Sequence, residues 1–121
     1  MNAEQADWLI VEDDPMLREE LSASLVERGY GVAAVGDGRE ALELLASAPR
    51  PRCMLVDLWM PVMSGSDLVE HLAAHPELAD VTVVVMTGTP DSVLASCLER
   101  AGLKLLSKPF TVDELIASAG M

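Results

Sequence analysis

Short runs of apolar residues alternate along the chain with segments in which apolar residues recur every three or four positions. The short runs predict five strands, at residues 8–11, 32–35, 53–56, 81–86 and 103–106. The run at 81–86 is rich in valine and does not alternate with polar residues, which is typical of a strand buried on both faces. We therefore expect helices to cover both sides of the sheet.

Capping residues mark the ends of the helices between these strands. Asp14 is a good N-cap, Pro15 suits the first helical position, and Gly29 is placed to end the first helix. Thr111 can cap the last helix in the same way. Apolar stripes at 41–45, 68–72 and 93–101 predict three helices between them. The chain therefore consists of five βα units, without a repeat, a linker or a low-complexity segment.

Strict alternation of strands and helices predicts an α/β fold, a doubly wound (βα)5 domain around a five-stranded parallel sheet. A length of 121 residues suits one domain, which we expect to span residues 1–121. Ligands of such folds bind at the carboxyl ends of the strands, where the strand order reverses. Polar residues at those ends are the first candidates for chemistry.

Polar side chains follow four of the five predicted strands. They are Glu12, Asp13 and Asp14 after the first strand, Asp57 after the third, Thr87 after the fourth and Lys108 after the fifth. Carboxylates that converge on one edge repel one another, and a hard divalent cation such as Mg²⁺ relieves this repulsion through oxygen ligands. We therefore expect a metal site with Lys108 as a second positive charge, and Asp14 as a helix cap rather than a ligand.

The same residues predict a phosphoryl-transfer chemistry. An aspartate carboxylate such as Asp57 can attack phosphorus and form an acyl phosphate without a general base. Such a transfer mainly requires positioning and neutralisation of charge, which the metal, Lys108 and the Thr87 hydroxyl would supply. Gly88, directly after Thr87, leaves space for a phosphoryl group to approach the backbone.

Charge and composition narrow the classes of function. Twenty acidic residues against eight basic ones give a formal net charge of -12, which argues against direct nucleic acid binding. The N-terminus lacks the cationic start of a signal peptide, and no apolar run is long enough to span a membrane. Cys53 and Cys97 form no CxxC pair and are expected to be reduced core residues. These features make the cytoplasm the expected location.

The ordered set of motifs resembles the response-regulator receiver domain of two-component signalling, a flavodoxin-like fold. The resemblance runs from Leu9 to about Ile116. It rests on Glu12-Asp13-Asp14-Pro15, Val56-Asp57-Leu58, Met60-Pro61 with Gly65, Thr87-Gly88 and Lys108-Pro109-Phe110. Each motif is weak alone, and their order at successive strand ends makes the combination specific.

The resemblance implies a role for each residue of the site. Glu12, Asp13, Asp57 and the backbone carbonyl of Trp59 would hold Mg²⁺ or Mn²⁺, and Asp57 would accept the phosphoryl group. Thr87 would be the switch hydroxyl, and Lys108 the lysine that contacts the phosphoryl group, followed by a cis bond to Pro109. The donor would be a sensor histidine kinase or a phosphotransfer protein. The domain would be a regulator rather than an enzyme acting on other substrates.

Two positions depart from the pattern of the family. Trp59 is bulkier than usual and predicts slow loss of the phosphoryl group, with an indole of no kinetic effect as the alternative. Leu105 stands where an aromatic residue is usual, and the preceding loop is one residue short, which puts the coupling to Thr87 in doubt. His71 and His75 are expected to be solvated or capping residues, not phosphorylation sites.

Two other functions remain open from the sequence. One is a receiver-like interaction domain that is not phosphorylated, which the departure at Leu105 keeps possible. The other is a Mg²⁺-dependent phosphatase of the haloacid-dehalogenase class, which also uses an aspartate nucleophile at a strand end. That class places a second aspartate two residues later, where this chain has Trp59.

Overall fold

The structure is a computed structural model that describes residues 6–47, 49–57, 70, 74, 80–88, 96, 99–100 and 102–121. The predicted helices at 68–72 and 93–101 lie largely outside these residues. Within the described part of the chain, no helix is both long and apolar enough to cross a bilayer.

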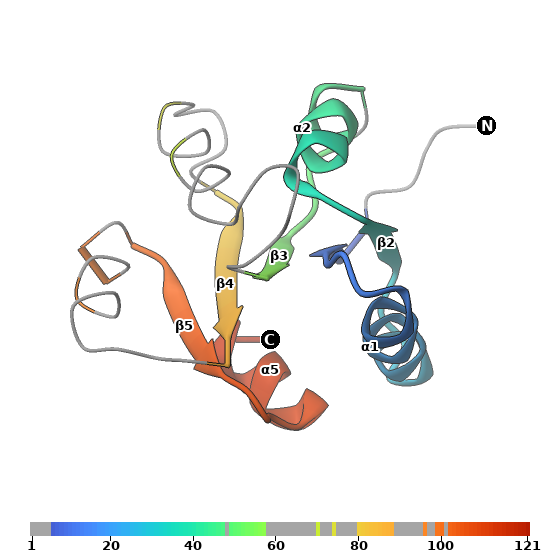
Figure 1. The fold of residues 1–121 in the computed structure, drawn as a ribbon, viewed down its shortest axis with the longest axis vertical. Coiled ribbons are helices and arrows are strands. Elements are labelled where there is room, and N and C mark those ends of the chain that lie inside the picture. The colour runs from blue at the N-terminus through green and yellow to red at the C-terminus, as the bar shows by residue number, and fades with distance from the viewer. Residues whose placement is uncertain are drawn as a thin grey trace.

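Five parallel strands form one sheet in the order β2-β1-β3-β4-β5 (Figure 1). Their bounds are β1 Trp8–Val11, β2 Val32–Val35, β3 Cys53–Asp57, β4 Thr82–Thr87 and β5 Lys104–Ser107. The sheet confirms the predicted architecture, with β4 and β5 each displaced by one residue from the expected range. The strand order reverses between β1 and β3, so a crevice for ligands is expected at the carboxyl ends of these two strands.

The described helices are α1 Pro15–Glu27, α2 Gly38–Ser47 and α5 Val112–Ser118. The three predicted capping residues, at both ends of α1 and at the start of α5, are confirmed. The Asp14 side chain accepts a hydrogen bond from the backbone N–H of Met16 at 3.0 Å, and Gly29 follows α1 with a φ of 89° that favours glycine. Thr111 and Glu114 form a reciprocal capping box at the start of α5.

Helices cover both faces of the sheet because alternate strand residues point to opposite sides. Leu9 and Val11 of β1 join a core cluster with α2, whereas Trp8 and Ile10 join a second cluster with α1 and α5. All four residues of β1 are at most 1% exposed. Burying one such apolar side chain stabilises the fold by roughly 1.5–3 kcal/mol, so the central strands anchor everything attached to their ends.

Cys53 belongs to the second cluster and is a free, buried cysteine. Burial raises the pKa of its thiol, and its Sγ lies 3.2 Å from Sδ of Met121. A thiol of raised pKa in an apolar setting is unreactive, which confirms the prediction of a reduced core residue. Cys97 lies outside the described residues.

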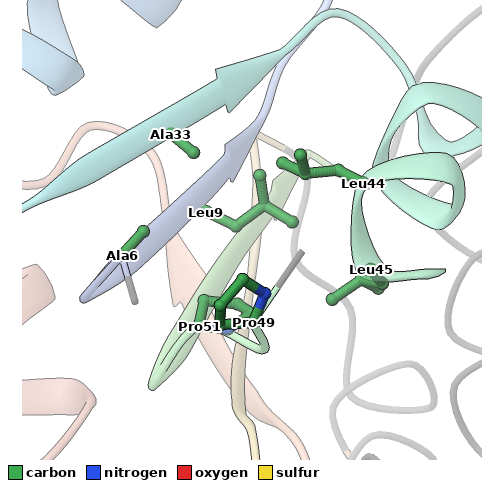
Figure 2. A pocket seen from close by; sticks show the side chains of 7 residues that line it. All are labelled: Ala6, Leu9, Ala33, Leu44, Leu45, Pro49 and Pro51. Carbon is green, nitrogen blue, oxygen red and sulfur yellow. The ribbon is translucent and has the colours of Figure 1, made fainter. Parts of the chain in front are cut away.

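An apolar cavity of about 180 Å³ lies beside the amino ends of β1 and β3 (Figure 2). Figure 2 shows side chains of β1, β2 and the last turn of α2 around it. The lining residues are Ala6, Leu9, Ala33, Leu44, Leu45, Pro49 and Pro51. None of them carries a charge or a nucleophile, so this cavity is separate from the polar residues at the carboxyl ends of the strands.

Candidate functional site

Three carboxylates meet at the carboxyl edge of the sheet, as the sequence predicts. Glu12 follows β1 directly and Asp57 ends β3, and these strands pair in parallel with Val11 beside Val56. One ligand oxygen from each of Glu12, Asp13 and Asp57 lies within 4.8 Å of the others. Glu12 and Asp57 are buried, whereas Asp13 is exposed, so the cluster has one side open to solvent.

Hydrogen bonds hold Glu12 from three directions. Its backbone N–H donates to the carbonyl of Val35 at 3.1 Å, and its carboxylate Oε1 accepts from the backbone N–H of Asp14 at 3.1 Å. Its carbonyl accepts a hydrogen bond from Nη1 of Arg18 at 2.8 Å. The second carboxylate oxygen, Oε2, is buried and has no hydrogen-bond donor among the described residues. A buried carboxylate oxygen without a donor is costly, and a cation is one partner that removes this cost.

The pKa of Glu12 reflects the same crowding. It is raised from 4.5 to about 8, chiefly by burial and next by a hydrogen bond to Asp57 that favours the protonated carboxyl. The backbone N–H of Asp14 and the charge of Lys108 act in the opposite direction. Near neutral pH the carboxyl of Glu12 therefore tends to keep its proton, and a divalent ion would take the place of that proton.

Lys108 connects the carboxylates to β4 and β5. Its Nζ lies 3.3 Å from Oδ2 of Asp57, and its backbone N–H donates to the carbonyl of Thr87 at 2.8 Å. The bond between Lys108 and Pro109 is cis, as the family resemblance implies. Thr87 ends β4 and is 0% exposed. The ends of β3, β4 and β5 thus bring Asp57, Thr87 and Lys108 into one neighbourhood.

The structure describes only some of the other positions that the sequence singled out. These positions lie outside the described residues: the backbone carbonyl of Trp59, the loop of Met60, Pro61 and Gly65, and the two histidines, His71 and His75. Leu105 is half-buried in β5 and packs against the core cluster on the α2 side. A Cβ added to Gly88 would meet no described atom within 4 Å, so the space next to Thr87 is open.

The cluster suits a hard divalent cation. It offers three carboxylates, one of them with an oxygen that has no donor among the described residues, and a cationic side chain in contact with Asp57. Mg²⁺ prefers few protein carboxylates and completes its shell with water or phosphate oxygens, which the exposed side at Asp13 allows. On the chemistry of its donors, the site fits Mg²⁺ together with a phosphoryl group.

Arg18 is a contact of the site that the sequence did not indicate. It lies on α1, four residues after Asp14 and therefore one turn above the cap. Without the fold, one arginine among the polar residues of a helix is indistinguishable from a solvated side chain. Only the packing of α1 beside β1 places its guanidinium on the carbonyl of Glu12.

A shallow apolar groove borders the same site. It is lined by Leu17 and Leu21 of α1 and by Lys108, Pro109 and Phe110, and Nζ of Lys108 also contacts Asp57. The groove has a volume of about 250 Å³. Met16, next to Leu17, is 80% exposed. Apolar surface of this kind beside a reactive group is typical of a docking surface.

Comparisons with known proteins agree with this geometry. The family model described as "Response regulator receiver domain" matches residues 8–119. The chain is 39% identical over 116 residues to the sensor histidine kinase TmoS of Ectopseudomonas mendocina. This match covers 95% of this chain and 12% of that kinase. It is 38% identical over 111 residues to the response regulator MprA of Mycolicibacterium vanbaalenii. This match covers 90% of this chain and 46% of that regulator. The chain thus spans less than half the length of either relative.

Solved structures give the same result. A response regulator receiver protein from Pseudomonas putida is 28% identical with a TM-score of 0.86, and 98% of each chain is covered. The receiver domain of a signal transduction histidine kinase from Syntrophus aciditrophicus is 31% identical with a TM-score of 0.82, covering 95% of this chain and 87% of that one. From its sheet order, its acidic edge and these matches, the chain belongs to the family of response regulator receiver domains of two-component signalling.

Proposed function

We propose that Asp57 accepts a phosphoryl group from a sensor histidine kinase or a phosphotransfer protein, and that this modification switches a partner interaction. In this proposal Glu12, Asp13, Asp57 and the backbone carbonyl of Trp59 hold Mg²⁺ or Mn²⁺. The observation that carries the proposal is the buried Oε2 of Glu12, which has no donor among the described residues and belongs to the carboxylate cluster around Asp57.

The transfer is a nucleophilic displacement at phosphorus. A carboxylate oxygen of Asp57 forms the new O–P bond, while the bond from phosphorus to the donor nitrogen breaks and its electron pair stays with the donor imidazole. The bound metal would neutralise charge on the phosphoryl oxygens. No proton has to leave the nucleophile, so the chain needs no general base, and its main contribution is position and charge.

Lys108 and Thr87 have distinct roles in this proposal. Nζ of Lys108 already lies 3.3 Å from Oδ2 of Asp57, so it is placed to pair with a phosphoryl oxygen once the carboxylate becomes an acyl phosphate, a mixed anhydride. Thr87 ends the neighbouring strand as a buried side chain, from where its hydroxyl can donate to the same group. A movement of the Thr87 side chain would change the end of β4 and therefore the surface that a partner binds.

The first test is intact mass after incubation with MgCl₂ and acetyl phosphate. We expect one phosphoryl adduct that requires the divalent metal and is absent from Asp57→Asn. Asp113→Asn is the matched control, because Asp113 is an exposed aspartate whose recorded ion pair is with Arg28 of α1. If native protein forms no adduct with acetyl phosphate or with a panel of phosphorylated histidine kinases, the chain is an interaction domain that has lost the chemistry.

A further inference from the structure

We propose that Arg18 is a positioning residue for the metal ligands, which holds the turn of residues 12–14 in the geometry that binds the divalent ion. The inference rests on the proposed function, since it concerns the same site. Arg18 lies on α1 and is half-buried, and it contacts the main chain of Glu12 rather than a carboxylate.

The contact completes the restraint on Glu12. Nη1 of Arg18 donates to the carbonyl of Glu12 at 2.8 Å, which is short for a nitrogen–oxygen hydrogen bond and typical of a charged donor. The N–H of the same residue is bound to Val35. The N–H belongs to the peptide before Glu12 and the carbonyl to the peptide that leads into Asp13, so the two bonds restrain the peptides on both sides of Glu12. This restraint limits the directions from which the side chains of Glu12 and Asp13 leave the backbone.

The neighbouring loop is shaped around the guanidinium. A Cβ built on Gly36 would lie 3.3 Å from Nη1 of Arg18 and 3.5 Å from Oε1 of Glu40. Gly36 has no positive φ that would demand glycine, so its missing side chain is better explained by the room that Arg18 occupies. Gly36 also donates its N–H to Oε2 of Glu40 at 3.4 Å. Arg18 thus joins the end of β1 to the loop between β2 and α2.

Such a contact acts on metal affinity more than on the chemical step. Groups that orient metal ligands without touching the ion typically change affinity by roughly 10–100-fold when they are removed. Arg18 binds the main chain of Glu12, and in this proposal it acts through the metal ligands as a positioning residue and not as a catalytic residue. Its loss should raise the concentration of Mg²⁺ that is needed and leave the rate at saturating Mg²⁺ nearly unchanged.

The test compares Arg18→Met with Arg28→Met. Arg28 is a second arginine of the α1 region, which pairs with Asp113 and with the carbonyl of Ser24 at the other end of the helix. The Mg²⁺ dissociation constant is measured from thermal unfolding over a series of MgCl₂ concentrations, without phosphodonor. We expect it to rise roughly 10-fold in Arg18→Met and to stay unchanged in Arg28→Met. The acetyl phosphate reaction should need more Mg²⁺ for half-saturation but reach the native rate.

A second pair of variants carries the test if Arg18→Met fails to fold. Gly36→Ala places a methyl group against the guanidinium, while Gly31→Ala meets its nearest neighbour, Asp7, only at 3.7 Å. A weaker Mg²⁺ affinity in Gly36→Ala alone supports the role of Arg18. Equal Mg²⁺ affinity in native protein, Arg18→Met and Gly36→Ala overturns it. Native protein that shows no stabilisation by Mg²⁺ overturns the proposed metal site itself, which is a separate result.

Discussion

Glu12 carries the largest electrostatic cost among the described side chains of the site. It is 2% exposed, and the pKa of its carboxyl is raised to about 8 by burial and by its hydrogen bond with Asp57. Between pH 4.5 and about 8, the folded protein therefore binds a proton that the unfolded chain has released. By linkage, the free energy of unfolding of the metal-free protein falls as the pH rises through this window.

This sign gives a measurable prediction for Glu12→Gln. In EDTA, native protein should lose stability between pH 5 and pH 8 by on the order of a few kcal/mol relative to the variant, because glutamine keeps the neutral form at every pH. Urea unfolding at several pH values measures the difference. Added Mg²⁺ should restore the stability of native protein at pH 8 and should do little for Glu12→Gln. Parallel pH profiles for the two proteins would contradict the burial of a titrating carboxyl.

The residues of the site differ in how far the sequence could predict them. Five residues were predictable because they lie at the ends of strand runs, and parallel strands end at a common edge. They are Glu12, Asp13, Asp57, Thr87 and Lys108. Arg18 was not, since a helical residue contacts the site only through the angle at which its helix packs on the sheet. The pKa of Glu12 was likewise out of reach, because burial is a property of the assembled layers.

At the level of elements, strand existence was predictable and strand ends were less so. The apolar run from Val81 predicts a strand that starts one residue too early. The parallel register places Thr82 opposite Cys53, and the bonded strand continues to Thr87. Val81 lies before the first paired residue but is still buried in the core, so an apolar run can be longer than the paired strand. Hydrophobic pattern therefore locates burial better than it locates pairing.

Filling the cavity between β1, β2 and α2 with a larger side chain would test how well these elements pack. Ala33 of β2 lines this cavity of about 180 Å³, whereas its neighbour Ala34 is exposed. Ala33→Val should raise the free energy of unfolding by roughly 0.5–1 kcal/mol, because the added carbons fill apolar space. Ala34→Val has the same gain in strand propensity and should change stability by less than about 0.5 kcal/mol. Equal effects in urea unfolding would show that the cavity is already filled.

At the level of the whole molecule, the reactive edge and the groove beside Lys108 form one continuous surface. Leu17 and Leu21 line the groove from α1, and Met16, which precedes Leu17 in the sequence, is exposed. A small donor such as acetyl phosphate needs only the reactive edge. Under the proposed function, a protein donor would also place its own surface against α1 beside the groove. We therefore expect the two kinds of donor to depend on different residues.

Met16→Glu separates these two requirements. Transfer from the phosphorylated histidine kinase that reacts fastest with native protein should slow about 5-fold, as expected for the loss of a contact of about 1 kcal/mol. Phosphorylation by acetyl phosphate should stay the same. Val26→Glu is the matched control, since Val26 is the other large exposed apolar residue of α1 among those described and lies near its far end. If both variants slow the kinase equally, the effect is one of added charge and not of docking.

The strand order has a consequence for the protein as it leaves the ribosome. The three strands β2, β1 and β3 are neighbours in the sheet and all lie within the first 57 residues, so this half can pair before β4 and β5 exist. At that stage Glu12, Asp13 and Asp57 are already brought together, while Lys108 has not yet been made. The nascent chain therefore meets the repulsion of its own carboxylates before it possesses Lys108, and in that interval the counter-charge near Glu12 comes from Arg18 and from cellular cations.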